Sequence, residues 1–475
     1  MKSSLLCSFI AILLYSCSTP KPTNSPNTSD CSFLEGIEDY SRLKCGRLEV
    51  PENHDKPNGK KISIAYVVLK SEDSLTTQYP MIYFTGGPGG PALRSITQNL
   101  NNPILKTRDI IRFDQRGIGY SSPLPDLTTR IYDLLAEDLT SEQEYESMKR
   151  VMADLRNECD EKSIEIEAYN TFQNANDVGM LMDHLGYEKY NLRGTSYGTR
   201  IARVVADKFP EKIHSAIYDS PAPVRSDFLT SRLDDYSLAL RKVFDACESS
   251  PYCNEKYPNI EQTYMEVLGE AEEQPIAATY QGEPFYLNPQ DLIFMVRKEL
   301  YRNDSRDLVP RYIYSLKERD MASINLILEQ RGSTTANYSM FLACESFSQY
   351  DTSVTEEALK LKYDSLELMP YELALFTSLY LASSKFMQRY ATPDMLELNV
   401  SSIPSLLLIN QFDPVTPPEN VIEFESKITF TQSFTLDEGG HGGGDMVCKR
   451  AIYDQFMTNP MGELDTDCLK LWNPI

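Results

Sequence analysis

The sequence predicts an α/β fold: a mostly parallel central sheet with helices on both faces, interrupted by an inserted helical cap domain. Around residues 176–219, short apolar runs alternate with segments of helical periodicity, which is typical of parallel strands joined by helices. From about 226 to 395 the alternation stops and helical patterns follow one another. The predicted domains are therefore a sheet domain built from 31–225 and 396–475, and a cap built from 226–395.

The first part of the sheet domain opens with a predicted β-hairpin. Residues 46–70 hold two apolar runs on either side of the turn PENHDKPNGK. Two more predicted strands, in PMIYF and RDIIRF, each run into a glycine-containing loop. These loops are TGGPGG at 85–90 and DQRGIGYSS at 114–122.

The alternation of helices and strands comes next. Residues 176–186 are predicted to form a helix that begins at Asn176 or Asp177 and ends at Gly186. The next predicted elements are a strand in KYNLRG, a helix in TRIARVVADKFP and a strand in HSAIYDSP. Cap helices are expected in SLALRKVFDACE, QTYMEVLGEAEE, QDLIFMVRKELYR, EEALKLKYDSLELM and ELALFTSLYLASSKFMQRY. Strands then return in SIPSLLLINQFDP and TQSFTLDEGG, followed by a helix near 446–457.

Composition narrows the functional class. The formal net charge is −23, and such a surface repels phosphate backbones, so nucleic acid is not an expected partner. The chain has four histidines and no C-x-x-C pair, so no metal site is expected, and no organic cofactor is implied.

The N-terminus predicts export. Lys2 precedes an apolar run from Leu5 to Leu14, which is the pattern of a signal peptide over 1–16. The stretch LLYSCS resembles a bacterial lipoprotein signal, so we expect a lipid on Cys17 that attaches the protein to a membrane of the cell envelope. Residues 17–30 are rich in Pro, Ser, Thr and Asn and are expected to form a flexible tether. The alternative is an ordinary secreted protein cleaved nearby.

Cysteine usage fits the same compartment. Eight cysteines remain after the signal peptide and Cys17 are set aside, and an even count in an exported chain indicates disulfides. Short spacings favour Cys31–Cys45, Cys247–Cys253 and Cys448–Cys468, which leaves Cys159–Cys344 as the remaining pair. Sequence alone does not choose among the possible connectivities.

Ser196 is the predicted nucleophile. It lies in Gly194-Thr195-Ser196-Tyr197-Gly198, a G-x-S-x-G pattern with a predicted strand before it and a helix after it. This is the setting of a nucleophile elbow, in which glycines allow a tight turn that exposes the serine above the sheet. The alternative is a glycine turn whose serine only caps the helix.

A serine nucleophile needs a base and an orienting carboxylate. His441, in the loop DEGGHGGG after a predicted strand, is the expected base. His54 lies in a polar hairpin turn, His184 on the solvent side of a helix, and His214 at the start of a strand. Asp413 is the expected carboxylate and completes the chain order Ser, Asp, His, with Asp437 as the competitor.

Acyl transfer also requires hydrogen-bond donors for the developing oxyanion. The backbone N–H of Tyr197 is one expected donor, because it directly follows the nucleophile. The second is expected from the loop TGGPGG, with Gly87 as the first candidate and Gly86 as the second.

These motifs together resemble a known family. The segments GGPGG, DQRGIGYSS, GTSYGTR, FDPVTPPEN and GGHG, in that order, are similar to those of the proline iminopeptidase and tripeptidyl aminopeptidase family of α/β-hydrolases. CGRLEVPENH resembles the secreted tripeptidyl aminopeptidase branch. The resemblance covers about 31–470. It implies a serine exopeptidase that acts on peptides with a free N-terminus, a helical cap, and a triad of Ser196, Asp413 and His441.

Two departures from the family pattern bear on this expectation. Thr85 stands where the family usually has a histidine before the double glycine, and no cap motif identifies the acidic residues that bind the substrate amine. Glu345 is a candidate for that role, and its alternative is a solvated helix carboxylate. The same fold and triad also occur in esterases and amidases, and a non-catalytic binding lipoprotein is the third hypothesis.

Overall fold

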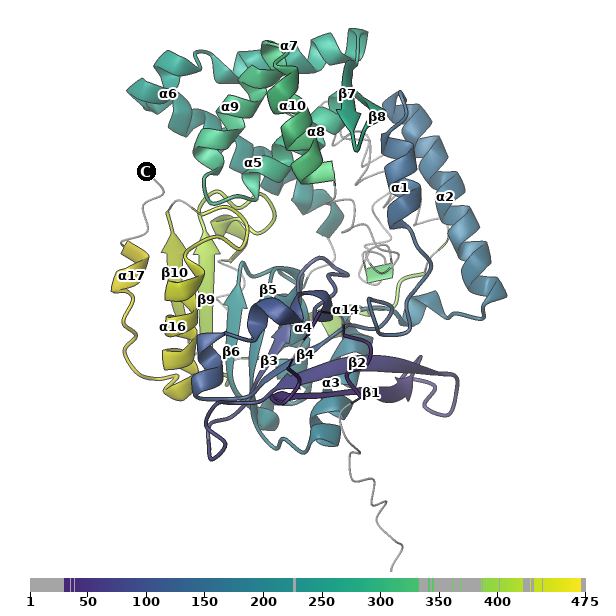
Figure 1. Ribbon diagram of the computed structural model, residues 1–475, viewed down its shortest axis with the longest axis vertical. Coiled ribbons are helices and arrows are strands. Elements are labelled where there is room, and N and C mark those ends of the chain that lie inside the picture. The colour runs from purple at the N-terminus through teal and green to yellow at the C-terminus, as the bar shows by residue number, and fades with distance from the viewer. Residues whose placement is uncertain are drawn as a thin grey trace, which may run out of the picture.

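An eight-stranded sheet forms the centre of the molecule, with the strand order β1-β2-β4-β3-β5-β6-β9-β10 (Figure 1). The computed structural model describes residues 30–470, with gaps. The gaps are 35, 38, 225–227, 333–340, 342–343, 346–360, 362–367, 369–385, 387, 401, 422–427, 429–430 and 438. The strands are β1 Leu43–Pro51, β2 Lys61–Leu69, β3 Met81–Phe84, β4 Ile110–Phe113, β5 Tyr190–Thr195, β6 Ile213–Asp219, β9 Ser405–Asn410 and β10 Thr431–Leu436.

The sheet is mostly parallel, as predicted. β1 pairs antiparallel with β2, and β2 antiparallel with β4, whereas every pairing from β4 to β10 is parallel. The β1–β2 hairpin at 43–69 matches the predicted one. Because β5, β6, β9 and β10 run in the same direction, the loops that follow them gather at one edge of the sheet, where open α/β sheets hold their ligands.

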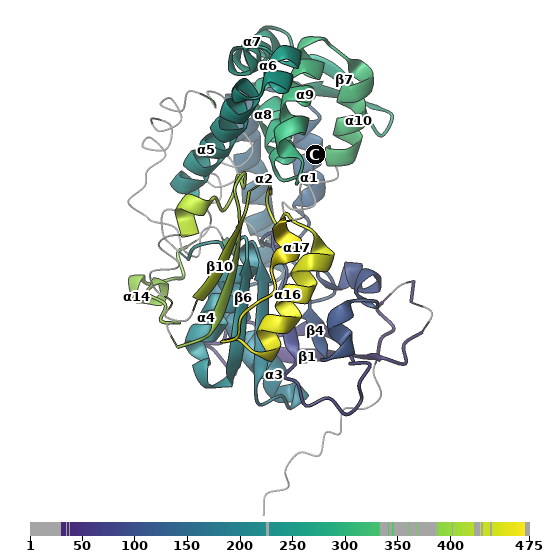
Figure 2. The same cartoon turned by 90° about the vertical axis from the view of Figure 1, so that its left-hand side faces the viewer.

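Helices cover both faces of the sheet (Figure 2). The helices α3 Thr171–Leu185 and α4 Tyr197–Lys208 pack on one face, and α16 Met446–Thr458 packs on the other. Alternate strand residues point to opposite faces, so Leu407 belongs to the core beneath α4 and Leu406 to the core beneath α16. The short helices of the sheet domain are η1 Leu93–Asn99, η2 Pro103–Lys106, η3 Ile166–Ala168, η4 Pro210–Lys212 and α17 Asp467–Lys470. A further short helix, α14 Pro393–Leu396, lies where the predicted cap range ends.

The start predicted for α3 was wrong. The helix begins at Thr171, because the Asn170 side chain accepts hydrogen bonds from the N–H groups of Phe172 and Gln173, both at 3.0 Å. Neither Asn176 nor Asp177 is its N-cap. The predicted end is confirmed: Gly186 has φ +79°, the left-handed conformation that commonly closes a helix.

The cap lies above the carboxyl edge of the sheet (Figure 1). Its described elements are α5 Phe228–Ser249, α6 Pro251–Lys256, α7 Ile260–Glu273, β7 Ile276–Tyr280, β8 Glu283–Leu287, α8 Pro289–Leu300, α9 Ser305–Lys317 and α10 Met321–Gly332. Three predicted cap helices coincide with α5, α7 and α8. The antiparallel β7–β8 hairpin was not predicted. The helices expected at 356–369 and 372–390 fall mainly outside the described residues.

A second helical projection precedes α3. Helices α1 Thr128–Leu135 and α2 Ser141–Glu161 rise from the sheet domain beside the cap (Figure 1). The start of α2 is a capping box formed by Thr140 and Gln143. The Gln290 side chain of α8 donates to the Leu139 carbonyl at 2.9 Å, which connects this projection to the cap.

Within the part of the chain that the structure describes, three disulfides form: Cys31–Cys45, Cys247–Cys253 and Cys448–Cys468. They are the three pairs favoured by short spacing, and they are compatible with export. The remaining pair expected from the sequence, Cys159–Cys344, was wrong: both residues are buried free thiols. Burial raises the pKa of Cys159 to about 11. Among the described residues, no helix combines the length and apolarity needed to cross a bilayer.

Candidate active site

The turn that carries Ser196 joins β5 directly to α4. Ser196 has φ +55° and ψ −128°, an unusual conformation for a residue other than glycine, of a kind that costs about 1–3 kcal/mol. A Cβ on Gly198 would lie 2.1 Å from the Phe84 carbonyl oxygen, and a Cβ on Gly194 would lie 2.5 Å from the backbone of Gly198. The turn therefore requires both glycines.

Ser196, His441 and Asp413 form a hydrogen-bonded chain at the carboxyl edge of the sheet. Ser196 Oγ is 2.7 Å from His441 Nε2, and His441 Nδ1 is 2.8 Å from both carboxylate oxygens of Asp413. The three side chains come from the loops after β5, β10 and β9. An ionised Asp413 keeps the proton on Nδ1, which leaves Nε2 free to accept the serine proton.

Asp413 is fully buried and is held as a carboxylate. Its Oδ1 accepts hydrogen bonds from the N–H groups of Val415 and Thr416, and its Oδ2 accepts one from the Thr416 hydroxyl, all at 2.8 Å. Burial by itself raises the pKa of Asp413, but the His441 ring and these donors outweigh it, so the pKa lies below its ordinary value. Asp437, the competing carboxylate, is exposed.

The loop around His441 packs directly under the turn between α8 and α9 of the cap. A Cβ on Gly440 would lie 2.2 Å from the Arg302 carbonyl oxygen, and a Cβ on Gly443 would lie 2.4 Å from Asn303 Oδ1. Asn303 Oδ1 also accepts a hydrogen bond from Gly444 N at 3.0 Å. These contacts explain why the segment GGHGGG is so rich in glycine.

The loop TGGPGG lies against Ser196. A Cβ on Gly86 would be 3.0 Å from Ser196 Cβ, and Gly87 has φ +126°, a conformation that favours glycine. Thr85, which replaces the expected histidine, donates to the Gly90 carbonyl at 2.7 Å, and the Gln115 amide donates to the Thr85 carbonyl at 3.2 Å. Hydrogen bonds of Thr85 and Gln115 therefore fix the conformation of this loop.

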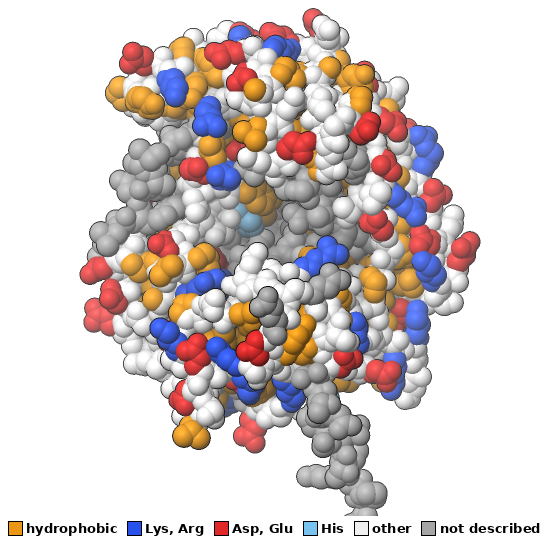
Figure 3. Space-filling view, viewed as in Figure 1, with side chains coloured by type: hydrophobic (Ala, Val, Ile, Leu, Met, Phe, Trp, Pro, Cys, Tyr) orange, Lys and Arg blue, Asp and Glu red, His pale blue; other side chains and the backbone are white. Residues whose placement is uncertain are grey.

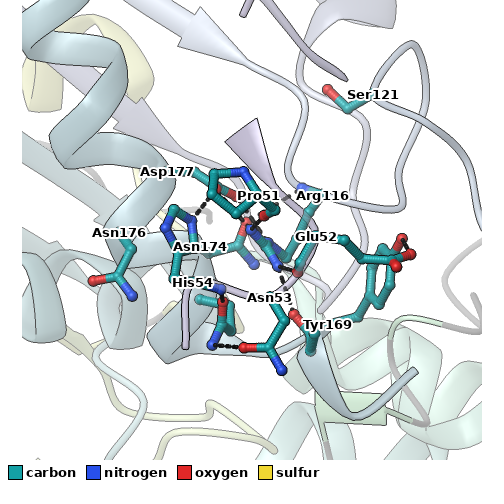
Figure 4. Close-up of polar contacts among 12 residues, drawn as sticks. Pro51, Glu52, Asn53, His54, Arg116, Ser121, Tyr169, Asn174, Asn176 and Asp177 are labelled. Atoms are coloured by element: carbon teal, nitrogen blue, oxygen red, sulfur yellow. Dashed lines mark hydrogen bonds and ion pairs between the residues drawn. The ribbon is translucent and has the colours of Figure 1, made fainter. Parts of the chain in front are cut away.

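His54 belongs to a buried ion-pair cluster of the sheet domain (Figure 4). Its Nε2 is 2.7 Å from Asp177 Oδ1, and the Arg116 guanidinium binds both oxygens of Asp177, at 2.7 and 2.8 Å. Arg116 also donates to the carbonyls of Pro51 and Glu52. The motifs PENH and DQRG thus both contact Asp177 of α3. The His54 side chain is bonded to Asp177 and does not lie near Ser196.

The other two histidines also lie away from Ser196. His184, on the exposed side of α3, is 3.2 Å from the Tyr66 hydroxyl. His214 packs beside Tyr79 at the amino end of β6, with ring centroids 4.8 Å apart. That end of the strand is opposite to the edge that holds the site.

Glu345 is neither a solvated carboxylate nor an exposed cap residue. It is 1% exposed, and its carboxylate accepts hydrogen bonds from Thr171 N at 2.6 Å and Thr171 Oγ1 at 2.5 Å. The Thr171 hydroxyl is in turn 2.9 Å from the Tyr197 hydroxyl. Glu345 therefore accepts hydrogen bonds from the first residue of α3, next to the turn that carries Ser196.

Sequence reasoning missed Tyr301. Its ring lies edge to face with the His441 ring, at a centroid distance of 5.1 Å. No sequence pattern marks a single tyrosine at the end of a cap helix.

A hollow opens between the sheet domain and the helices above it, and a histidine side chain is visible inside (Figure 3).

Comparisons with known proteins agree with this geometry. Residues 79–253 match a family model described as the alpha/beta hydrolase fold, and residues 383–468 match one described as TAP-like protein. The chain is an α/β-hydrolase. Within that fold, its residues 383–468 resemble the TAP-like family.

Named relatives match one part of the chain. The tripeptidyl aminopeptidase of Streptomyces lividans is 30% identical over 188 residues, which are 38% of this chain and 35% of that protein. The serine protease Hip1 of Mycobacterium tuberculosis is 25% identical over 201 residues, 40% of this chain and 38% of that protein. The matches thus span less than two fifths of the length of these relatives.

A solved structure of similar extent is the proline iminopeptidase of Mycobacterium smegmatis. It aligns with 88% of this chain and 99% of its own, at 15% identity and a TM-score of 0.41.

Proposed function

We propose that the protein is an exported serine aminopeptidase that cleaves residues or short peptides from free peptide N-termini. The observation that carries the proposal is the chain from Ser196 Oγ through His441 to buried Asp413, with distances of 2.7 and 2.8 Å. The partial match to a tripeptidyl aminopeptidase supports the peptide substrate. The proposed catalytic domain consists of 31–225 and 396–475, and 226–395 covers it as a cap.

In the proposed reaction, His441 Nε2 takes the proton of the Ser196 hydroxyl as Oγ bonds to the scissile carbonyl carbon. The oxyanion accepts hydrogen bonds from the N–H groups of Tyr197 and Gly87. Protonated His441 then gives its proton to the leaving amine, the C–N bond breaks and an acyl-enzyme remains. Water, deprotonated by His441, attacks this ester, releases the N-terminal fragment and restores Ser196.

Asp413 acts on this chemistry through His441. Its carboxylate holds the imidazole in the required tautomer and stabilises the imidazolium that forms in each step. The hydrogen bonds that Asp413 accepts from Val415 and Thr416 support this role, because they keep the carboxylate ionised although it is buried away from water.

A fluorophosphonate probe and a matched pair of peptides test the proposal. Wild-type protein should be labelled at Ser196, and Ser196→Ala should be unlabelled and inactive while keeping its melting temperature. A peptide with a free N-terminus should be cleaved, and its N-acetylated twin should not. Equal cleavage of both would favour an endopeptidase, cleavage of esters alone an esterase, and no labelling of the folded protein a binding protein.

Export and lipid attachment at Cys17 complete the proposal. The signal pattern over 1–16 and the three disulfides support it. In a bacterial host, the protein should incorporate a radiolabelled fatty acid and sediment with membranes. Cys17→Ser should remove the label, and retention of the label would refute attachment at this residue.

A further inference from the structure

Two adjacent residues at the end of β6 connect the three parts of the candidate triad. The Asp219 carbonyl accepts a hydrogen bond from Ser196 N at 2.9 Å, and Ser220 N donates to the Leu408 carbonyl of β9 at 2.9 Å. The Ser220 hydroxyl accepts hydrogen bonds from Gly442 N and from the Asn410 amide, at 2.9 and 2.8 Å. The strand that ends here therefore touches the nucleophile turn, the strand before Asp413 and the histidine loop.

Lys449 also contacts the histidine loop, through hydrogen bonds to its backbone. It lies on α16, is 0% exposed, and its ammonium donates to Asp219 Oδ1 at 2.8 Å, to the Gly443 carbonyl at 2.8 Å and to the Gly442 carbonyl at 3.3 Å. An ammonium has three N–H donors, and three acceptors surround it here. Two of those acceptors belong to the residues that directly follow His441.

The Asp219 carboxylate offsets the cost of burying the positive charge of Lys449. Its second oxygen accepts a hydrogen bond from the Tyr453 hydroxyl at 2.9 Å and lies 3.8 Å from Arg193. Burial lowers the pKa of Lys449, and the Asp219 carboxylate opposes that effect. A buried ion pair contributes little net stability compared with apolar side chains of the same volume. Packing alone therefore does not account for a lysine at this position.

The histidine loop needs such external support because of its composition. In the segment GGHGGG, His441 is the only residue with a side chain, and glycine backbones lose the most conformational freedom on folding. Gly442 and Gly444 have positive φ angles, +70° and +103°. The loop is held instead through its backbone, by Ser220 and Lys449 from the sheet domain and by Asn303 from the cap.

We propose that Lys449 is a positioning residue for His441. Its ammonium, neutralised by Asp219, fixes the carbonyls of Gly442 and Gly443 and so keeps the imidazole within hydrogen-bonding distance of Ser196. The inference rests on the proposed serine chemistry of this site and adds a residue to it. A displacement of about 1 Å in a catalytic group is enough to lower a rate about 10²-fold.

The test compares Lys449→Met with the double variant Lys449→Met/Asp219→Asn. The single variant leaves Asp219 buried without its cation, so both stability and activity should fall. The double variant removes both charges of the Lys449–Asp219 pair, so its melting temperature should recover most of the loss. Arg193, 3.8 Å from Asp219, keeps its contacts with the Tyr83 and Tyr453 rings. The fluorophosphonate labelling rate and kcat of the double variant should stay roughly 10- to 100-fold below wild type, with KM changed less than about threefold, because the glycine carbonyls still lack their donor.

Tyr453→Phe is the matched control. It removes the other hydrogen bond to Asp219 without touching the histidine loop, so the labelling rate and kcat should be unchanged. A double variant that regains both stability and wild-type labelling would overturn the proposal, because the pair would then serve only the fold. If the double variant does not fold, the labelling rate of folded Lys449→Met decides, and a wild-type rate there would overturn the proposal.

This experiment separates the two levels of inference. Fluorophosphonate labelling depends on Ser196 and His441 and not on the peptide, so it reports the effect of Lys449 even if the wild-type protein prefers esters. Absence of labelling in folded wild-type protein would refute the serine chemistry itself.

Discussion

Tyr301 and His441 meet edge to face across the boundary between the cap and the sheet domain, with ring centroids 5.1 Å apart. Tyr301 directly follows α8, and His441 follows β10, so the contact joins residues 140 positions apart. The cap is therefore part of the surroundings of the candidate base as well as a cover over the site.

Tyr301→Ala should lower kcat/KM by about 2- to 10-fold, because an aromatic pair of this kind contributes roughly 0.5–1.5 kcal/mol. Tyr301→Phe keeps the ring and should retain near wild-type activity. Steady-state kinetics on the same substrate measure both. Equal losses in the two variants would show that the hydroxyl, not the ring contact, is what matters.

Asp413→Asn should change how stability depends on pH. The pKa of Asp413 in the folded protein lies below its unfolded value of about 3.9. The carboxylate therefore stabilises the fold above that value, and this contribution is lost as the pH falls through the folded pKa. Urea unfolding between pH 3 and pH 6 should give a difference between wild type and variant that is largest at pH 6 and shrinks toward pH 3. A difference that does not vary with pH would contradict the assignment.

Gly198→Ala should prevent the nucleophile turn from forming as described. The added Cβ would lie 2.1 Å from the Phe84 carbonyl oxygen, so β3 and α4 would have to move apart. We expect a loss of at least about 2 kcal/mol in the free energy of unfolding and loss of fluorophosphonate labelling. Gly269→Ala in α7 is the control, because a Cβ there meets nothing within 4 Å. It should be neutral or stabilising by up to about 1 kcal/mol.

Arg116→Met should destabilise the fold strongly, by roughly 3–5 kcal/mol, because Asp177 would keep a buried charge with its main partner removed. Arg130→Met is the comparison, since Arg130 pairs with Glu158 at a site where both side chains are partly exposed. That change should cost less than about 1 kcal/mol. Chemical denaturation measures both variants, and similar losses would refute the structural role given to the Arg116 cluster.

Much of the sheet domain is visible in the sequence because its signals are local. The apolar strands, the glycine loops after them and the periodicity of α4 lie in short segments, so the succession of strands and helices along the chain and the G-x-S-x-G turn follow from the sequence. The order of the strands in the sheet was not predicted. The N-cap of α3 was misplaced by six or seven residues because a better cap, Asn170, lies nearly two turns earlier. The β7–β8 hairpin was missed because its strands have only five residues each and a polar turn at Gln281 and Gly282.

The features of the site that the sequence did not predict depend on contacts between residues far apart in the chain. The bond between Glu345 and Thr171 spans 174 positions, and that between Lys449 and Asp219 spans 230. Nothing near Glu345 in the sequence marks it as buried at the start of α3. Likewise, the glycines at 440 and 443 suggest a flexible loop when read alone, whereas the structure shows that each one makes room for a cap residue.

That last arrangement constrains how this protein could be rebuilt. An exchange of the cap as one unit would cut this chain after β6 and before β9. Here the backbone at Leu300 and Arg302 and the side chain of Asn303 fit against glycines of the sheet domain with no space for a methyl group. A chimera that brings in a foreign cap would have to carry a matching turn after its fourth helix, or bring its own histidine loop with it.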